Sequence, residues 1–212
     1  MGSAPSPLPS AHETPTDLAP AVRPPLPVKM VVAGGFGVGK TTAVAAVSEI
    51  EPLTTEASIT EVAAGIDDVS LTPNKTTTTV AMDFGCLTLD PTLKLYLFGT
   101  PGQDRFGFMW DDLALGAIGA LVIVDSRRLD DCYPAVDYFE RLGLPFVVAV
   151  NRFHGKVSHD LPSIRWALAV DDDVPLVTFD ARDKLSVRDA LLVVLDQALA
   201  RARRAAEARA GA

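Results

Sequence analysis

The amino-acid sequence predicts an α/β fold of three layers, with helices on both faces of a mostly parallel sheet that contains one antiparallel hairpin. From Val28 onward, apolar runs of strand length alternate with helical segments, which is typical of layered α/β domains. Residues 120–124 are apolar throughout, as expected of a buried strand. Residues 79–89 and 93–98 are joined by only three residues, too few for a crossover between parallel strands, so these two must pair as an antiparallel hairpin.

The predicted elements follow one another in a simple order. A strand at residues 28–33 precedes a helix at 42–47, and the hairpin comes after a long polar stretch at 51–78. A stretch of that length without clear structure inside a compact domain is usually functional. The remaining elements alternate: strand 120–124, helix 131–142, strand 145–150, helix 163–169, strand 174–179 and a final helix that begins near Ser186, a plausible N-cap.

The length of 212 residues suits one domain with a tail. Residues 1–27 are rich in Pro, Ala and Ser and have no apolar period, so we predict a disordered leader there. Residues 28–200 form the predicted domain. Residues 201–212 are rich in Ala and Arg, and we expect a helix end or tail that protrudes into solvent.

Composition and charge argue against several classes of function. The net charge of −8 is unsuited to broad nucleic-acid binding and gives no support for attachment to an anionic membrane. Cys86 and Cys132 are too few and too scattered for a disulfide scaffold or a metal site. No apolar stretch approaches the length of a membrane span, and the N-terminus lacks the apolar core of a secretory signal. We therefore expect a cytoplasmic protein without a direct membrane anchor, so that any recruitment to a membrane occurs through partners.

Residues 34–41, GGFGVGKT, fit the phosphate-binding pattern G-x-x-x-x-G-K-[ST]. The strand before it and the helix after it are the context that this motif requires, and they argue against a glycine-rich turn that contains Lys-Thr by chance. Glycines let backbone N–H groups curl around phosphate oxygens, and the helix N-terminus adds partial positive charge. Lys40 is expected to reach the terminal phosphates, and the Thr41 hydroxyl to ligate Mg²⁺. The predicted nucleotide contacts of this loop are Gly35, Phe36, Gly37, Val38, Gly39, Lys40, Thr41 and Thr42.

Further polar segments follow the other predicted strands, at residues 99–103, 151–154 and 180–182. The carboxyl ends of strands in an open α/β sheet meet at one edge, where ligands bind. The order of these segments resembles that of the Ras-like small GTPases, and the resemblance, which implies a P-loop G domain, covers residues 28–200. The runs TTVAMDFG and FGTPGQDRF are similar to those of the bacterial conservon GTPases of actinomycetes and, more distantly, of MglA-like GTPases.

The resemblance implies roles for residues near the γ-phosphate. Thr79 looks like the switch threonine that senses this phosphate and Mg²⁺, although a β-branched strand residue within the threonine run 76–79 is the alternative. Gly102 would donate its N–H to the γ-phosphate. Gln103 would be the catalytic residue that orients the attacking water, and an exposed polar turn residue is the alternative there.

The resemblance also implies how a guanine base would bind. Asn151 would meet N7, the stem of Arg152 would cover the base face, and the N–H of Ala181 would meet O6. His154 stands where the family has an aspartate that accepts two hydrogen bonds from guanine, and a neutral imidazole offers at most one acceptor, so we expect a reduced preference for guanine. The segment that stands in place of the family's Ser-Ala-Lys consists of Asp180, Ala181 and Arg182.

Two further departures from the family bear on hydrolysis. Gly99 stands where an acidic residue normally holds Mg²⁺ through water, so we expect weaker metal binding; MglA-like proteins also lack this residue. Phe36 occupies a position that is glycine in Ras, and its ring over the γ-phosphate region would obstruct Gln103 or an incoming arginine. We therefore predict slow intrinsic hydrolysis.

The segment after Gln103 is unusually aromatic. Phe106, Phe108 and Trp110 are predicted to form an effector surface, because aromatic rings are good interface anchors. Ordinary packing under the sheet is the alternative. By resemblance, the partners would be a roadblock-type regulator and a sensor-kinase-like protein.

Three functions are compatible with these observations. The first is a GTP-regulated switch that uses Mg²⁺ and alternates between GTP and GDP. The second is a nucleotide-binding or nucleotide-free scaffold, favoured by the three departures at Phe36, Gly99 and His154. The third is another P-loop ATPase or kinase, against which the antiparallel hairpin and the Pro-Gly-Gln segment argue.

Overall fold

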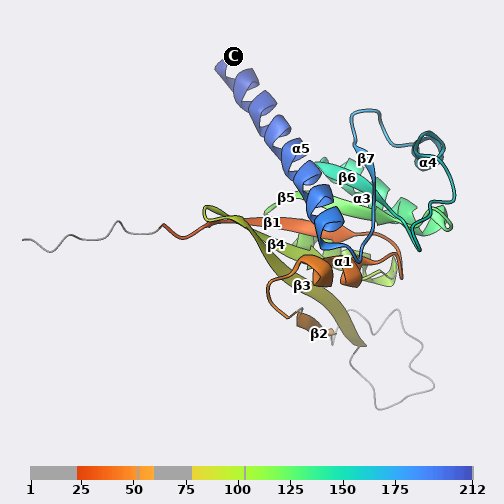
Figure 1. Cartoon of the computed structure of the whole chain (residues 1–212). Helices are drawn as coiled ribbons and strands as arrows, with labels where there is room; N and C mark the ends of the chain where they lie inside the picture. Colours follow the sequence, from red (N-terminus) through yellow and green to blue (C-terminus); the bar gives the residue numbers. More distant parts are fainter. Residues whose placement is uncertain (1–22, 52, 60–77, 103, 212) are drawn as a thin grey trace, which may run out of the picture.

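A computed structural model describes residues 23–51, 53–59, 78–102 and 104–211. In this part of the chain a seven-stranded sheet has the order β2-β3-β4-β1-β5-β6-β7 (Figure 1). The strands are β1 (Leu26–Ala33), β2 (Leu53–Ile59), β3 (Thr78–Asp90), β4 (Leu93–Gly99), β5 (Ala117–Val124), β6 (Phe146–Asn151) and β7 (Leu176–Phe179). The helices are α1 (Lys40–Val47), α2 (Trp110–Ala114), α3 (Tyr133–Leu142), α4 (Leu161–Leu168) and α5 (Lys184–Ala210), with short 3₁₀ helices η3 (Asp104–Met109) and η4 (Leu129–Cys132).

The predicted hairpin is confirmed. β3 and β4 pair antiparallel, and the Asp90 carboxylate shapes their tight connection by accepting a hydrogen bond from the Thr92 N–H at 2.6 Å. β4, β1, β5, β6 and β7 then pair in parallel, as the fully apolar runs indicated. The mostly parallel α/β fold expected from the sequence is therefore correct.

β2 is an element that the sequence did not predict. It lies within residues 51–78, which we expected to lack clear structure, and it pairs antiparallel with β3. β3 has 13 residues and β4 has only seven. The backbone N–H and C=O groups on the edge of β3 that faces away from β4 are therefore left to pair with β2. Backbone pairing with an existing edge requires no apolar pattern, which is why hydrophobic periodicity missed this strand.

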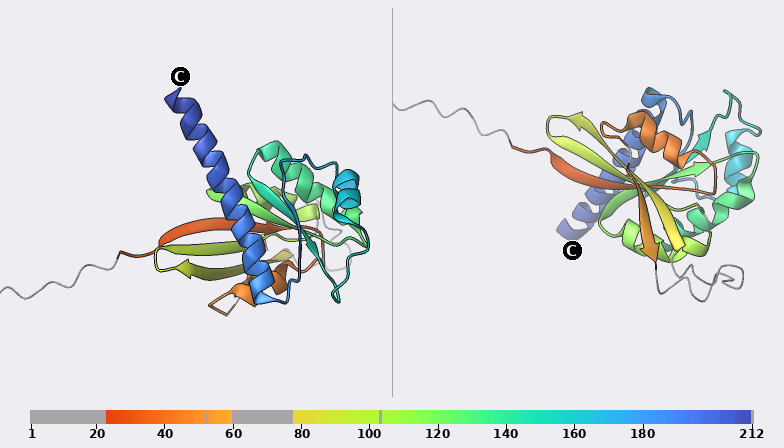
Figure 2. Two further views of the ribbon diagram at one scale, coloured as in Figure 1. Left: turned by 45° about the horizontal axis from the view of Figure 1, so that its top comes forward. Right: turned by 90° about the horizontal axis from the view of Figure 1, so that it is seen from below.

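Helices cover both faces of the sheet (Figures 1 and 2). α1 and α5 contact each other on one face. On the other face, Trp110 of α2 stacks on Phe139 of α3, with the ring centroids 6.4 Å apart. The side chains of β5 and β6 are almost entirely buried between these layers, so the central strands hold the carboxyl edge of the sheet rigidly.

The two ends of the predicted domain differ slightly from expectation. β1 begins at Leu26, so the predicted leader of residues 1–27 includes the first two residues of a strand. The final helix begins at Lys184, because the carboxylate of Asp183 accepts the N–H of Ser186 at 2.8 Å and so caps the helix; the predicted cap at Ser186 was wrong. α5 runs unbroken to Ala210, and its last turns project into solvent beyond the sheet (Figure 1).

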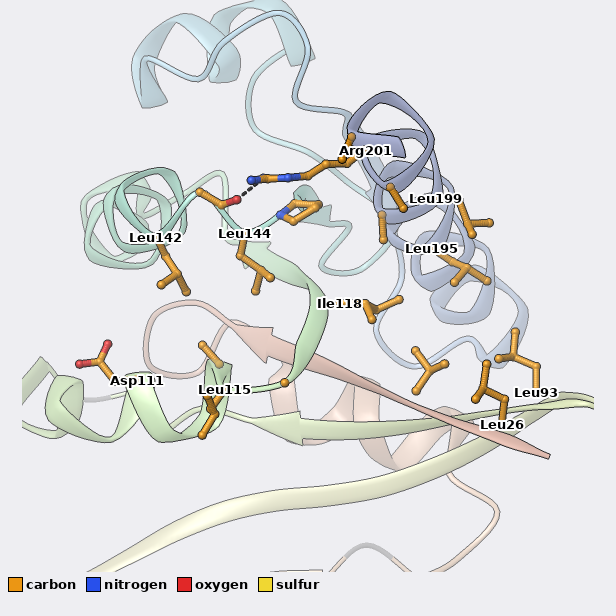
Figure 3. A pocket seen from close by; sticks show the side chains of 18 residues that line it. Leu26, Leu93, Asp111, Leu115, Ile118, Leu142, Leu144, Leu195, Leu199 and Arg201 are labelled. Carbon is orange, nitrogen blue, oxygen red and sulfur yellow. Dashed lines mark hydrogen bonds between the residues drawn. The ribbon is translucent and has the colours of Figure 1, made fainter. Parts of the chain in front are cut away.

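An apolar groove of about 890 Å³ lies beside the projecting half of α5 (Figure 3). Leu26 and Leu93 line it at the starts of β1 and β4, and Leu195 and Leu199 line it from α5. This is the amino edge of the parallel strands, opposite the edge where ligands bind in open α/β sheets. None of the helices in the described ranges is both long and apolar enough to cross a membrane.

Candidate nucleotide site

The loop at residues 34–41 joins the end of β1 to the start of α1, as the motif requires. The loop turns tightly, with φ of 71° at Gly37 and 111° at Gly39, values that glycine adopts without strain. The Ala43 N–H already bonds to the carbonyl of Gly39 at 2.8 Å, so the preceding N–H groups of α1 and the loop are the donors left to face an anion.

Lys40 is buried and folded back on this loop. Its Nζ donates to the carbonyls of Gly34 at 2.9 Å and Gly35 at 2.6 Å. Desolvation by burial lowers the pKa of Lys40 to about 8, against the opposing effect of the nearby carboxylate of Asp83. An incoming phosphate would provide the counter-charge that this ammonium group lacks, because two neutral carbonyls are weaker partners than an anion.

Gly102 lies directly against the phosphate loop. A Cβ at this position would come within 2.6 Å of Lys40 Nζ and 3.0 Å of both the Gly35 carbonyl oxygen and Phe36 Cα. Only glycine permits so close an approach. The Gly102 segment and the phosphate loop are thus in contact, which is the arrangement that a γ-phosphate sensor needs.

Asp83 is a site residue that the sequence analysis missed. It lies in β3 directly opposite Gly99 of β4, and its Oδ2 accepts a hydrogen bond from the Thr41 hydroxyl at 2.7 Å. A Cβ on Gly99 would be 2.9 Å from Asp83 Cβ and 3.0 Å from Oδ2. A carboxylate of the neighbouring strand therefore lies beside Gly99, and the absence of a side chain at Gly99 makes room for it.

A signal for Asp83 was present in the sequence. It is an acidic residue inside an apolar strand, two residues before Gly85 and four before Leu87, both of which are buried. Alternate residues of a strand share a face, so the pattern places a carboxylate on a buried face. A buried carboxylate needs a partner, but which strand lies beside it is decided only by the pairing of β3 with β4.

The oxygen atoms of Thr41 and Asp83 fit Mg²⁺. This ion prefers hard oxygen ligands, and it is usually held by one or two carboxylates together with substrate phosphates rather than by a complete protein cage. The described residues contain no cluster of three or more His, Cys, Asp or Glu side chains that could hold a metal alone. When bound, Mg²⁺ would neutralise phosphate charge at this position.

Asn151 ties the phosphate loop to the segment after β7. This buried side chain donates through Nδ2 to the Val38 carbonyl at 3.0 Å, and its Oδ1 accepts the N–H of Ala181 at 3.2 Å. Both predicted base-contacting groups, Asn151 and the Ala181 N–H, are thus brought together at the carboxyl edge. The second N–H of the Asn151 amide carries no hydrogen bond to the described residues.

The other predicted base residues lie around this link. Arg182 hydrogen-bonds both carboxylate oxygens of Asp180, which lowers the pKa of Asp180 to about 2. Arg152 also acts on Asp180 electrostatically. His154 is exposed and has a positive φ of 55°, so it closes the turn after β6. These residues form a rim beside Asn151, and His154 brings no carboxylate to it.

Two buried polar atoms on this edge lack a hydrogen-bond partner in the described part of the chain. They are the hydroxyl of Thr100, which follows β4, and Nε of Arg152, which follows β6. Buried polar groups are nearly always paired, so unpaired ones call for an explanation such as a ligand. Both atoms lie at the strand ends where the sequence placed the nucleotide.

The predicted effector surface is only partly exposed. Phe108 is 43% exposed, but Trp110 is buried against Tyr138 and Phe139, with the Trp110–Tyr138 ring centroids 5.2 Å apart. Trp110 is therefore a core residue, because it faces the layer formed by α3. The side chain of Phe106 lies outside the described set.

The remaining predictions concern residues at the mouth of the site. The ring of Phe36 is 66% exposed at the loop tip. Gln103 lies outside the described residues, and for Thr79 only the backbone, in β3, is within them. The catalytic glutamine and the switch threonine thus stay predictions.

Comparison with known proteins identifies relatives of this chain. The sequence model of a family described as conserved hypothetical ATP-binding proteins matches residues 32–201. An uncharacterised protein of Methanocaldococcus jannaschii is 32% identical over 127 residues, which cover 59% of this chain and 70% of that protein.

Solved structures with a similar fold include G domains of the FeoB iron transporter. The apo cytosolic domain of T. maritima FeoB matches with a TM-score of 0.58 at 16% identity, over 82% of this chain and 64% of that one, so this chain spans less than two thirds of it. The FeoB G domain of Methanococcus jannaschii matches with a TM-score of 0.53 at 14% identity, over 81% and 98% of the two chains. At such identities the likeness shows the fold, which is the P-loop G-domain fold that the sequence predicted. The closer resemblance to conservon and MglA-like GTPases stays a prediction.

Proposed function

The chain belongs to the family described as conserved hypothetical ATP-binding proteins. From the geometry of its site and the fold that it shares with G domains, we propose that it is a guanine-nucleotide switch that binds GTP with Mg²⁺ and hydrolyses it slowly. The observation that carries the proposal is the Thr41–Asp83 pair beside the phosphate loop. It supplies the hydroxyl and the carboxylate that a Mg²⁺–phosphate complex needs, at the point where the loop enters α1.

The phosphates would be held by this chain's own donors. The N–H groups of the loop and of the start of α1 face the anion, and Lys40 exchanges the carbonyls of Gly34 and Gly35 for phosphate oxygens. Thr41 and Asp83 would hold the metal. Because Gly102 lies against Lys40 and Phe36, a γ-phosphate must displace this segment, and that displacement is the proposed switch.

Hydrolysis itself is attack by water. The water oxygen forms a bond to the γ-phosphorus, the bond from the γ-phosphorus to the β–γ bridging oxygen breaks, and the released proton ends on inorganic phosphate. Gln103 would orient the water, by resemblance. The ring of Phe36 is exposed at the loop tip. By resemblance this position borders the γ-phosphate, so the ring would hinder the approach of Gln103 or of an arginine and slow the reaction.

The base pocket favours guanine over adenine through the Ala181 N–H. Guanine presents the acceptor O6 to a backbone donor, whereas adenine presents the donor amino group N6 at the same position, so two donors would face each other. The contact of the Ala181 N–H with Asn151 Oδ1 is long, at 3.2 Å, so a better acceptor can compete for it. His154 offers no carboxylate to the other edge of guanine, so the expected preference is modest.

The test is a titration of the full chain with four nucleotides. After identification and removal of any co-purified nucleotide, the affinities for GDP, GTP, ADP and ATP are measured with and without Mg²⁺. We expect the guanine nucleotides to bind more tightly and Mg²⁺ to strengthen binding. Lys40→Ala should abolish binding, whereas Lys94→Ala, with the same charge change at the start of β4, should bind like the wild type.

The outcomes separate the alternatives. Tighter binding of ATP would contradict the guanine pocket while leaving the phosphate site intact. Absence of binding to all four nucleotides would refute the proposal and favour a scaffold without nucleotide. Equal binding by the Lys40→Ala variant and the wild type would show that the nucleotide is held somewhere else.

A further inference from the structure

Arg128 contacts the outside of the phosphate loop. It lies four residues beyond the end of β5, and its Nη2 donates to the carbonyl of Phe36 at 2.9 Å. Its Nη1 is 3.2 Å from a carboxylate oxygen of Asp131, and its Nε is 3.8 Å from Asp125. The side chain is 50% exposed, so it stands at the open rim of the site.

The turn that carries Arg128 is also held by another side chain. The neighbouring Arg127 holds this turn together, because it donates three hydrogen bonds to the buried carboxylate of Asp125 and stacks over the ring of Phe153 at 4.2 Å. Arg128, in contrast, makes one hydrogen bond among the described residues, and an arginine side chain carries several N–H donors. Its other nitrogens face the carboxylates of Asp131 and Asp125, and the half-exposed Arg128–Asp131 ion pair can open to a more highly charged anion.

The contact with Phe36 places this cation at the tip of the phosphate loop, from which a long side chain can turn toward a terminal phosphate. A Cβ on Gly37 would lie 3.6 Å from Arg128 Nη2, so the guanidinium spans the Phe36–Gly37 peptide at the loop tip. Lys40 approaches the same loop from within, through Gly34 and Gly35. The loop therefore lies between two cations in a chain whose net charge is −8, which otherwise repels a polyphosphate.

We propose that Arg128 is a catalytic arginine supplied by the chain itself, which exchanges the Phe36 carbonyl for oxygens of the γ-phosphate and stabilises their charge during hydrolysis. This inference rests on the proposed function. In the reaction described above, charge accumulates on the oxygens of the γ-phosphate as the bond to the bridging oxygen breaks, and a planar guanidinium binds such oxygens in a forked geometry. Arg128 neither takes nor gives a proton.

The test compares Arg128→Ala, Arg128→Lys and Arg203→Ala with the wild type, all as full-length chains. Arg203 lies on the exposed part of α5, so its removal changes the charge equally but leaves the site intact. Single-turnover hydrolysis at saturating GTP and the affinities for GTP and GDP are measured, and melting curves establish that each variant is folded.

We expect Arg128→Ala to hydrolyse GTP about a hundredfold more slowly, since arginines in this role contribute roughly 10³–10⁵ in the strongest cases and this one is half exposed. GTP affinity should fall about tenfold relative to GDP affinity. Arg128→Lys should recover part of the rate, as should guanidinium ion at about 20 mM added to Arg128→Ala. Arg203→Ala should match the wild type.

An equal loss of GDP and GTP affinity, with an unchanged rate at saturation, would overturn the inference and leave Arg128 as a brace of the loop. A rate equal to that of Arg203→Ala would also overturn it. If the wild-type chain binds nucleotide and the Arg128 variants give one of these two results, the catalytic role of Arg128 is refuted but the proposed function stands. If the wild-type chain binds none, both fall.

Discussion

The pairing of Asp83 with Gly99 predicts that the carboxylate can be moved between two strands. Asp83→Gly removes it, Gly99→Asp adds a second one, and the double variant Asp83→Gly/Gly99→Asp transfers it from β3 to β4. Positions 83 and 99 face each other in the sheet. An aspartate at position 99 therefore places its carboxylate in the space that the Asp83 carboxylate occupies in the wild type. The facing pair of positions keeps one glycine and one aspartate, as in the wild type.

The magnitudes follow from the contacts. Asp83→Gly removes a charged hydrogen bond to Thr41, about 1.5–3 kcal/mol in the free energy of unfolding. Gly99→Asp alone brings a Cβ to 2.9 Å from Asp83 Cβ, and two carboxylates about 4 Å apart repel by about 4 kcal/mol at an effective dielectric constant of about 20. The double variant loses neither the bond nor the space, so the coupling between the two substitutions should offset both single losses and reach about 6 kcal/mol.

Two assays measure this cycle. Urea denaturation gives the free energies of unfolding, and release of a bound fluorescent GDP on addition of EDTA gives the Mg²⁺ dependence. In Asp83→Gly, the rate of GDP release should be the same with and without EDTA. In the double variant, EDTA should again accelerate the release. Asp172→Gly, in an exposed turn before β7, is the control that should behave like the wild type. Additive effects in the double variant, or a full Mg²⁺ dependence in Asp83→Gly, would refute the assignment of Asp83 to the metal.

Three other predictions test separate parts of the site. Because the pKa of Lys40 is lowered to about 8 in the free protein, nucleotide binding above that pH must take up a proton, so affinity should fall by up to about tenfold per pH unit; calorimetry in buffers of different ionisation enthalpy that detects no proton uptake at pH 9 would contradict this. Asn151→Ala leaves the Val38 carbonyl and the Ala181 N–H unpaired, at about 1–3 kcal/mol each, and should lower the melting temperature by roughly 5–15 °C; an unchanged melting curve would argue against the link. Phe36→Gly should raise the single-turnover rate of GTP hydrolysis, and an equal rate would show that the ring does not obstruct the reaction.

The sequence was sufficient for the elements that depend on local pattern. The apolar runs gave the central strands, and the short connection between residues 89 and 93 required an antiparallel hairpin, because no crossover fits there. The phosphate loop could also be recognised from the sequence, because a glycine-rich turn between a strand and a helix, followed by Lys-Thr, is typical of phosphate binding. These features depend on neighbours along the chain, and periodicity and spacing report on such neighbours directly.

Several sequence-based expectations failed where the deciding contact is distant in sequence. β2 was missed because it forms by backbone pairing to the edge of β3, which leaves no apolar pattern. Trp110 was assigned to the effector surface, with packing under the sheet as the alternative, and the alternative is correct because α3 supplies Phe139 for it to stack on. The N-cap of α5 was misplaced by three residues, since Asp183 and Ser186 are both suitable caps and only the start of the helix distinguishes them.

By itself, the sequence determined the fold class, the phosphate loop and the edge of the sheet on which a ligand would lie. Only the tertiary structure decided what surrounds that loop. Gly99 has no carboxylate, but that of Asp83, 16 positions earlier in the sequence, lies beside it. Arg128 contacts Phe36, from which it is separated by 92 positions. The physical reason is that a strand's sequence specifies which of its residues share a face, whereas the register between strands specifies which side chains from distant segments meet over the ligand.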